Sequence, residues 1–427
     1  MSAVIPFRLK HVVVIAAVLG FDIATGLAGV APPASAQTAT PVPAAETVRP
    51  DVAKPLQAAQ DSVRAQQYKE ALAQVHEAEA VANKTPFETY MIDRTRGAAA
   101  MGAADTALAA SSFEAAIASG RMAPADQGKI VLALGGMYYQ AADYPKAIVW
   151  FQRAIKEGSA DGETRALLAQ SYYLGGDLPQ ATKELQADMA AAEKAGRAPT
   201  ETQLKLLLSI AIKQNDKAAY TVAMDRLLAA YPTKDYWADS MQRLRSKPGF
   251  PNYLVLDFDR LKLALGQLTT TGDVMELAQL ALQAGFPAEA KKVIELGYEK
   301  GLLGTGAAAA RHKQLQQQAG KAAADDLRTM ASSEADARKG KDGTALVNLG
   351  YALVTAGQAD KGIAMMEEGI ARGGLKRADE ARLRLGMAYF QAGKKTEAVK
   401  AFGAVQGTDG SADLARYWTI LINRPLT

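Results

Sequence analysis

LGGMYYQAADYPKAIVWFQRAIKEG, residues 134–158, decides the fold, because its pattern returns in LLAQSYYLGGDLPQATKEL, residues 167–185. Tyr138 recurs as Tyr172 and Pro145 as Pro179, in both cases 34 positions further along the chain. Each stretch predicts two short helices joined by a tight turn. A fixed period of this size, made of two helical runs, indicates an array of helical repeats.

The recurring residue types have physical reasons. Asp143 precedes the second helix, where its carboxylate can cap free backbone N–H groups, and Pro145 falls in the first turn, where a missing N–H costs nothing. Gly135 on the first helix is small enough for the second helix to approach closely, and Phe151 fills the space that remains. The pattern therefore specifies both the turn and the packing of each helix pair.

The repeat resembles the tetratricopeptide repeat family. Counted from residue 128, the small, aromatic and alanine slots of that motif hold Gly135, Tyr138, Ala147, Phe151 and Ala154. Two slots depart from it, since Val131 stands where the family often has Trp and Ser159 stands at the closing Pro position. The resemblance implies an all-α superhelix, or α-solenoid, whose members typically bind peptides or partner proteins.

Turn residues extend the pattern over roughly residues 52–410, in about ten units. The predicted turns lie 34 to 40 positions apart, at Gln66, Gly102, Ala142, Gly176, Asn215, Gly249, Gly285, Gly320, Gly357 and Gly393. The motif is most complete around 142, 176 and 393, and it is degenerate around 102, 215, 249 and 320. Because apolar burial stabilises a repeat, the Ala-rich unit around Gly320 is expected to be the loosest.

Residues 253–265 form an unusually apolar stretch in the middle of the array. Apolar residues at Leu254, Phe258, Leu261 and Leu265 predict a helix. One interpretation is a repeat with a longer turn, whose apolar stripe is core. The other is a kink or a surface for dimerisation.

Both ends differ from the array. Residues 1–36 have the features of an export signal: Arg8 and Lys10, a short apolar run, and the small-residue site Ala34-Ser-Ala36. An uncleaved anchor is the alternative, although Asp22 interrupts the run and argues against a stable membrane span. Residues 37–51 are predicted to be a disordered linker, and residues 411–427 a helix that caps the last repeat. Export predicts the periplasm or cell surface of a bacterium.

Composition excludes several functional classes. The chain has no cysteine, and hence no disulfide framework or thiol nucleophile. Removal of residues 1–36 would leave 47 basic and 44 acidic residues with interspersed signs, so nucleic acid is not an expected partner. His76 and His312 lie far apart, and we expect no metal, no cofactor and no catalytic site. His312 is predicted to be a solvated surface residue.

The resemblance places the first helix of each pair on the concave face. Aromatic groups flanked by amide and basic groups suit capture of an extended peptide or a sugar chain. The residues that the resemblance assigns to that face are Tyr139, Gln170, Tyr173, Lys205, Tyr236, Arg243, Tyr351 and Phe390. The alternative for Tyr139 and Tyr173 is packing between repeats. A basic cluster, residues 372–384, is predicted to be a solvated face.

We therefore expect a non-enzymatic interaction scaffold of the bacterial cell envelope that binds a peptide or partner protein. A polysaccharide-handling accessory protein of an export system is the alternative. An α-superhelical enzyme acting on peptidoglycan is a weaker one, because the repeats fill the chain.

Overall fold

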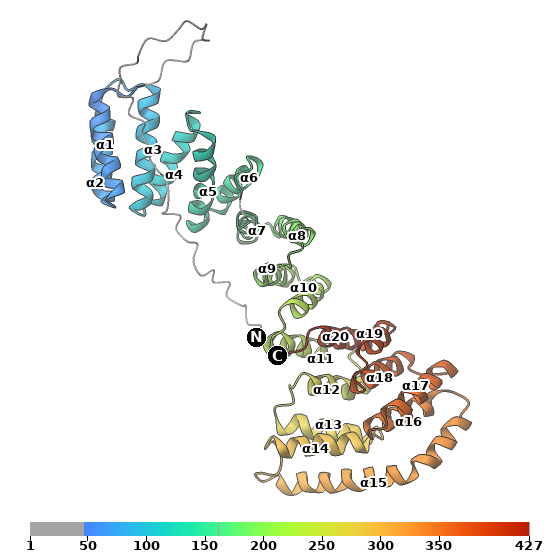
Figure 1. The fold of residues 1–427 in the computed structure, drawn as a ribbon. Helices are drawn as coiled ribbons and strands as arrows, with labels where there is room; N and C mark the ends of the chain where they lie inside the picture. Colours follow the sequence, from blue (N-terminus) through green and yellow to red (C-terminus); the bar gives the residue numbers. More distant parts are fainter. Residues whose placement is uncertain (1–46, 161, 427) are drawn as a thin grey trace, which may run out of the picture. The chain divides into compact units, whose positions relative to one another are not determined.

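The computed structural model describes residues 47–160 and 162–426 (Figure 1). These residues form twenty α-helices and one 3-10 helix, and no strand occurs among them. The all-α solenoid predicted from the sequence is thus confirmed. The expected export signal and most of the linker lie outside the described residues. The chain divides into two compact units, Met1–Pro199 and Thr200–Thr427, called here unit 1 and unit 2.

Unit 1 consists of four helical hairpins. Asp143 and Asp177 cap the second helices as expected, since their side chains accept from the backbone N–H groups of Lys146 and Gln180. The turn before each cap needs one left-handed residue, here Ala142 and Gly176. The helices are α1 (Pro50–Arg64), α2 (Tyr68–Ala80), α3 (Pro86–Gly102), α4 (Thr106–Ala118), α5 (Pro124–Gln140), α6 (Tyr144–Lys156), α7 (Thr164–Gly175) and α8 (Leu178–Lys194).

One contact recurs in the hairpins of unit 1. A Cβ at Gly135 would lie 2.6 Å from the Phe151 ring, and one at Gly97 would lie 2.6 Å from the Phe113 ring. Because each glycine lacks a side chain, it leaves room for the ring of a phenylalanine sixteen residues later in the chain. The α3–α4 hairpin is thus a regular repeat, although its sequence motif is degenerate. Its turn lies at Ala104, which has φ 60°, two residues after the predicted position at Gly102.

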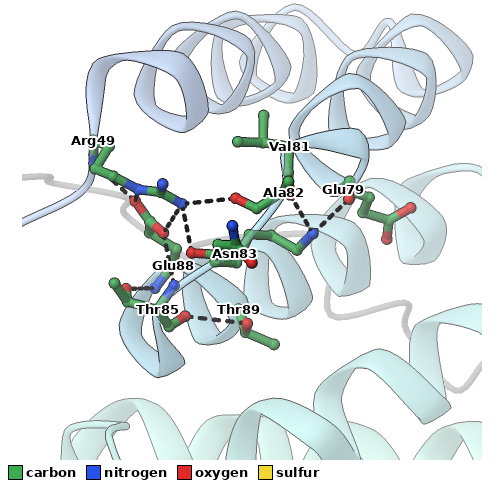
Figure 2. Close-up of polar contacts among 9 residues, drawn as sticks. Arg49, Glu79, Val81, Ala82, Asn83, Thr85, Glu88 and Thr89 are labelled. Atoms are coloured by element: carbon green, nitrogen blue, oxygen red, sulfur yellow. Dashed lines mark hydrogen bonds and ion pairs between the residues drawn. The ribbon is translucent and has the colours of Figure 1, made fainter.

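The first helix begins at an ion pair. Figure 2 shows Arg49, whose guanidinium donates to both carboxylate oxygens of Glu88 at 2.9 Å, while its backbone N–H also donates to that carboxylate. Thr85 and Glu88 form a capping box at the start of α3. These bonds, above all those from Arg49, lower the pKa of Glu88 to about 2. Helix α1 starts at Pro50, so the helical part includes the last two residues of the predicted linker.

Unit 2 continues the hairpins and then closes on itself. Its elements are α9 (Glu201–Lys213), α10 (Lys217–Ala230), α11 (Lys234–Arg245), the 3-10 helix η1 (Asn252–Leu254), α12 (Val255–Ala264), α13 (Thr271–Gln283), α14 (Pro287–Glu299), α15 (Ala309–Lys339), α16 (Thr344–Thr355), α17 (Ala359–Arg372), α18 (Ala378–Gln391), α19 (Lys395–Gly403) and α20 (Ser411–Asn423).

Helix α15 corrects one predicted repeat. Gly320 lies inside this continuous helix of 31 residues, so the turn expected there does not exist. The helix packs on α14 and α16 (Figure 1), and no residue between Ala319 and Met330 is buried. His312 near its start is buried, not solvated, and its Nδ1 accepts from the Gly304 N–H at 3.2 Å. The described part of the array therefore has eight packed hairpins, while α11 packs on α10, α12 packs on α13, and α15 is a single helix.

The apolar stretch at residues 253–265 is core. Leu254, Phe258, Leu261 and Leu265 are all buried in unit 2, which favours the longer-turn interpretation over a dimer surface. The longer turn lies between α11 and α12 and contains Gly249 with φ 80°.

Helix α20 joins distant parts of unit 2. It packs on α18 and α19, and also on α10 and α12 (Figure 1). The Tyr417 ring meets Trp237 of α11 edge-on at 5.7 Å, and the Arg416 guanidinium pairs with Asp225 of α10 at 2.6 Å. Trp418 is buried in this junction. The expected cap is thus a closing helix between the beginning and the end of the unit, and it does not simply cover a free end.

Candidate functional site

Three predicted residues of unit 1 come together on α5 and α7. The Tyr139 hydroxyl donates to Gln170 Oε1 at 2.9 Å, and its ring meets Tyr144 edge-on at 6.0 Å. Burial raises the pKa of Tyr139. Tyr173 and Tyr139 are half-buried, whereas Gln170 is buried and leaves little surface for a partner. Both rings are therefore partly accessible, and that of Tyr139 is held in place by Gln170 and Tyr144.

The helices that carry these residues lie side by side. In unit 1, α1 packs on α3 and α5 packs on α7, while α2, α4 and α6 each pack on the first helix of the next hairpin. The first helices α5 and α7 therefore lie next to each other on one surface, as on the concave faces of helical-repeat proteins.

Lys205 and Tyr236 form a second group, on α9 and α11 of unit 2. Both bind Glu201: the Lys205 Nζ lies 2.7 Å from its Oε1, and the Tyr236 hydroxyl donates to the same oxygen at 2.5 Å. These hydrogen bonds lower the pKa of Glu201. Arg243 does not join this group, because its Nε donates to Asp239 at 2.8 Å.

Tyr351 does not belong to a binding face. Its side chain is 0% exposed, with its ring 5.2 Å from that of Phe286 and 4.4 Å from the Arg260 guanidinium. Its hydroxyl accepts a hydrogen bond from Gln391 Nε2 at 3.1 Å. The prediction was therefore wrong for this residue, which belongs to the core that closes unit 2. Phe390 is half-buried and packs on Trp418, with 5.0 Å between the ring centroids.

A buried ion cluster lies next to Tyr351. Arg260, 3% exposed, donates to both carboxylate oxygens of Glu289 at 2.8 and 2.6 Å and to Asp257 at 2.5 Å. Burial alone would lower the pKa of Arg260, but Glu289 raises it well above the ordinary value. Arg384 of α18 also faces Asp257, at 3.4 Å, and is only 11% exposed. This arginine of the predicted basic face is therefore not solvated.

A cavity of about 310 Å³ opens beside this cluster, within unit 2. Helices α12, α14, α18 and α20 supply most of its wall, and the end of α16 supplies the rest. Phe390, at one wall, is the only lining residue that the sequence placed in a binding site. The lining comprises Arg260, Leu263, Ala264, Glu289, Lys292, Val293, Leu296, Thr355, Met387, Phe390, Gln391 and Trp418.

Sequence reasoning missed this cavity because its walls come from five helices separated by long stretches of chain. The only local signal was charge within an apolar helix, since Asp257 and Arg260 stand three residues apart in the stretch 253–265. Among the described residues, no group of three or more His, Asp or Glu side chains is arranged to hold a metal ion.

Comparison with known families agrees with the hairpins. A tetratricopeptide repeat family model matches residues 94–163, in unit 1, and 347–412, in unit 2. These two segments are thus similar to tetratricopeptide repeats. They include the α5–α6 hairpin, with its Gly135–Phe151 contact, and the α18–α19 hairpin. Outside them, the pairs α1–α2, α7–α8, α9–α10 and α13–α14 are further two-helix hairpins, whereas α15 is a single helix.

Solved structures of similar helical proteins were also found. The P58(IPK) tetratricopeptide domain is 14% identical over 87% of this chain and 98% of that one, with a TM-score of 0.23. The Naa15/Naa10 complex bound to HypK-THB gives 14% identity over 85% of this chain, with a TM-score of 0.31. This chain spans 65% of the length of the second protein. No curated protein matches.

None of the helices in the described part of the chain combines the length and the apolar character needed to cross a membrane.

Proposed function

We propose that the protein is a non-enzymatic interaction scaffold of the bacterial cell envelope. Tetratricopeptide repeats generally mediate protein–protein interactions, and two segments of this chain match them. In this proposal, an extended segment of a partner protein binds across α5 and α7 of unit 1. The observation that carries it is the pair of half-buried rings, Tyr139 and Tyr173, on neighbouring first helices.

The fixed position of Tyr139 favours binding. Its hydroxyl is held by Gln170 and its ring by Tyr144, so few rotamers remain to be lost when a partner binds. Tyrosine combines a large apolar ring with a polar tip, and buried tyrosines often dominate the binding energy of an interface. An extended peptide could lie along the first helices and place apolar side chains against both rings.

The envelope location rests on the sequence. Arg8 and Lys10, the apolar run after them and Ala34-Ser-Ala36 have the order of an export signal. We propose that the part of the chain from residue 37 onward is the exported form. Mass spectrometry of the protein recovered from its native envelope tests this proposal, since a retained residue 1–36 segment would contradict it.

Site-specific crosslinking tests the binding surface. A photoreactive benzoyl-phenylalanine in place of Tyr173 should crosslink a specific envelope protein in cells. The same group in place of Val149, which is 59% exposed on the second helix α6, is the matched control. Tyr139→Phe, which removes only the hydroxyl, should weaken the crosslink from position 173 by severalfold. Equal crosslinking from positions 149 and 173 would contradict the proposed face.

A further inference from the structure

The cavity in unit 2 has mostly apolar walls. Seven of the twelve lining residues have side chains that are wholly or mainly apolar: Leu263, Ala264, Val293, Leu296, Met387, Phe390 and Trp418. Its volume of about 310 Å³ is at the small end of the range for ligand pockets, roughly 300–1,000 Å³. A cavity of this size suits a ligand with one ring or a short branched chain.

The charges at the cavity do not cancel. Glu289 binds Arg260 through both carboxylate oxygens, so these two lining charges compensate each other. Lys292 is the third charged residue of the lining, and it is exposed. Its Nζ donates to the Thr355 carbonyl oxygen at 2.6 Å, and among the described residues no carboxylate lies within ion-pair distance of it. An ammonium group with further N–H donors is thus left at the wall.

A second polar group near the cavity lacks a partner. Trp418 lines the cavity and is 3% exposed, and its buried indole N–H has no acceptor among the described residues. A buried donor without an acceptor is unfavourable by about 1–3 kcal/mol. The Gln391 amide, also at the wall, donates to the Tyr351 hydroxyl. Lys292 is thus the charged group at the wall that keeps N–H donors for a ligand, which favours an acceptor of negative charge.

We propose that this cavity binds a ligand in which an apolar group carries a carboxylate. The apolar group lies between Phe390, Met387 and Leu296, and the carboxylate accepts hydrogen bonds from Lys292. Such chemistry is found in a free aryl- or alkyl-carboxylic acid, and also in a peptide with an apolar residue beside an acidic one. The site is separate from the proposed face on α5 and α7 and does not depend on it.

Titration with small probes tests the charge preference. The three probes share a phenyl ring and differ in charge. Phenylacetate is negative, benzyl alcohol is neutral and 2-phenylethylamine is positive. The full chain, labelled with ¹⁵N at tryptophan, reports binding through the Trp418 indole resonance, which Trp418→Phe identifies. We expect phenylacetate to bind at least tenfold more tightly than 2-phenylethylamine. Equal affinities, or no response of Trp418 to any probe, would overturn the proposal.

Two variants locate the binding groups. Lys292→Gln should weaken phenylacetate binding by about five- to tenfold and leave benzyl alcohol unchanged. Lys291→Gln is the matched control, because Lys291 is exposed on the same helix, pairs with Glu295 at 3.8 Å and does not line the cavity. Ala264→Phe, at an exposed position of the wall, should block both probes without altering the circular dichroism spectrum. Phenylacetate binding that survives both Lys292→Gln and Ala264→Phe would overturn the proposal.

A last comparison distinguishes the two sources of the ligand. N-acetyl-Asp-Phe-amide contains the same ring and carboxylate on a peptide backbone. Tighter binding of this dipeptide than of phenylacetate identifies a peptide as the ligand, whereas the reverse order identifies a free organic acid. Failure of both to perturb Trp418 would overturn the proposal, while leaving the crosslinking result for Tyr173 unaffected.

Discussion

Asp259 gives the sharpest test of the energetics of unit 2. This residue of α12 is 4% exposed, and its Oδ2 has no hydrogen-bond partner among the described residues. Burial raises its pKa from 3.8 to about 7, and nearby Glu276 adds to the effect. Lys262 acts in the opposite direction but does not compensate. The protein thus keeps a carboxyl group where ionisation is unfavourable, and Asp259→Asn should stabilise it.

The magnitude follows from the difference in pKa. A shift of about 3 units, at 1.36 kcal/mol per unit, corresponds to about 4 kcal/mol between the two protonation states. Below pH 3.8 the carboxyl is protonated in both the folded and the unfolded chain. As the pH rises from 3.8 to 7, the unfolded chain releases the proton first, so folding becomes less favourable. The advantage of Asp259→Asn should therefore grow over this interval and become constant above pH 7 or so.

Urea unfolding at pH 4.5 and 8.5 measures this effect. A Trp150→Phe background leaves Trp237 and Trp418, both in unit 2, as the fluorescent reporters. We expect Asp259→Asn to raise the free energy of unfolding by up to about 4 kcal/mol at pH 8.5, and by much less at pH 4.5. Asp336→Asn, at a side chain that is 73% exposed, is the control and should change it by less than about 0.5 kcal/mol. The same gain at both pH values would refute the reasoning.

Three further changes test the packing of the hairpins and the start of α1. Phe151→Ala should lower the free energy of unfolding by about 3–5 kcal/mol, measured by urea titration with circular dichroism, since the ring is buried; a loss below 1 kcal/mol would contradict this packing. Gly350→Ala should lower the melting temperature, because its Cβ would lie 2.6 Å from a backbone carbonyl oxygen, whereas Gly136→Ala has open space and should raise it slightly. Glu88→Gln should lower the free energy of unfolding at pH 7. This loss of stability should shrink as the pH falls from 4.5 towards 2, because Arg49 holds the pKa of Glu88 at about 2. A loss of stability that does not depend on pH would contradict the ion pair.

The hairpins could be predicted from the sequence because each one depends on residues within its own repeat. Gly135 and Phe151 stand sixteen positions apart, and the same spacing separates Gly97 from Phe113. A ring can fill the groove only where the facing residue is small, so this pairing fixes the helix register. The predicted turn at Gly102 was two residues off because it relied on glycine, whereas Ala104 takes the left-handed conformation.

Helix α15 could not be predicted from the spacing of turns. A regular period led to a turn at Gly320, but one glycine costs a helix only about 1 kcal/mol. Lys321 and three alanines follow it, all good helix formers, and no Asp or Asn stands directly after Gly320 in the way that Asp143 follows Ala142. The helix therefore continues through the glycine, and the contacts of its two ends with α14 and α16 replace those of a hairpin.

The exposure of the residues assigned to the binding face could be predicted only in part, for a related reason. The family positions identify which residues lie on a first helix, but exposure also depends on what packs there later in the chain. Tyr139 stays half-exposed, whereas Tyr351 is covered because Phe286 and Arg260 lie against its ring. These neighbours precede it by more than sixty residues, and no repeat pattern relates them to it.

Closure of unit 2 is therefore the feature that the repeat pattern in the sequence does not predict. In an open array each repeat contacts only its neighbours. Here the Tyr253 hydroxyl donates to Asp409 at 2.6 Å across 156 positions, and α20 packs on α10 and α12. A free repeat end exposes an apolar helix face, and closure buries that face against the unit's own earlier helices. The same closure brings α18 and α20 opposite α12 and α14, so the cavity with Lys292 and Trp418 exists only because the array turns back on itself.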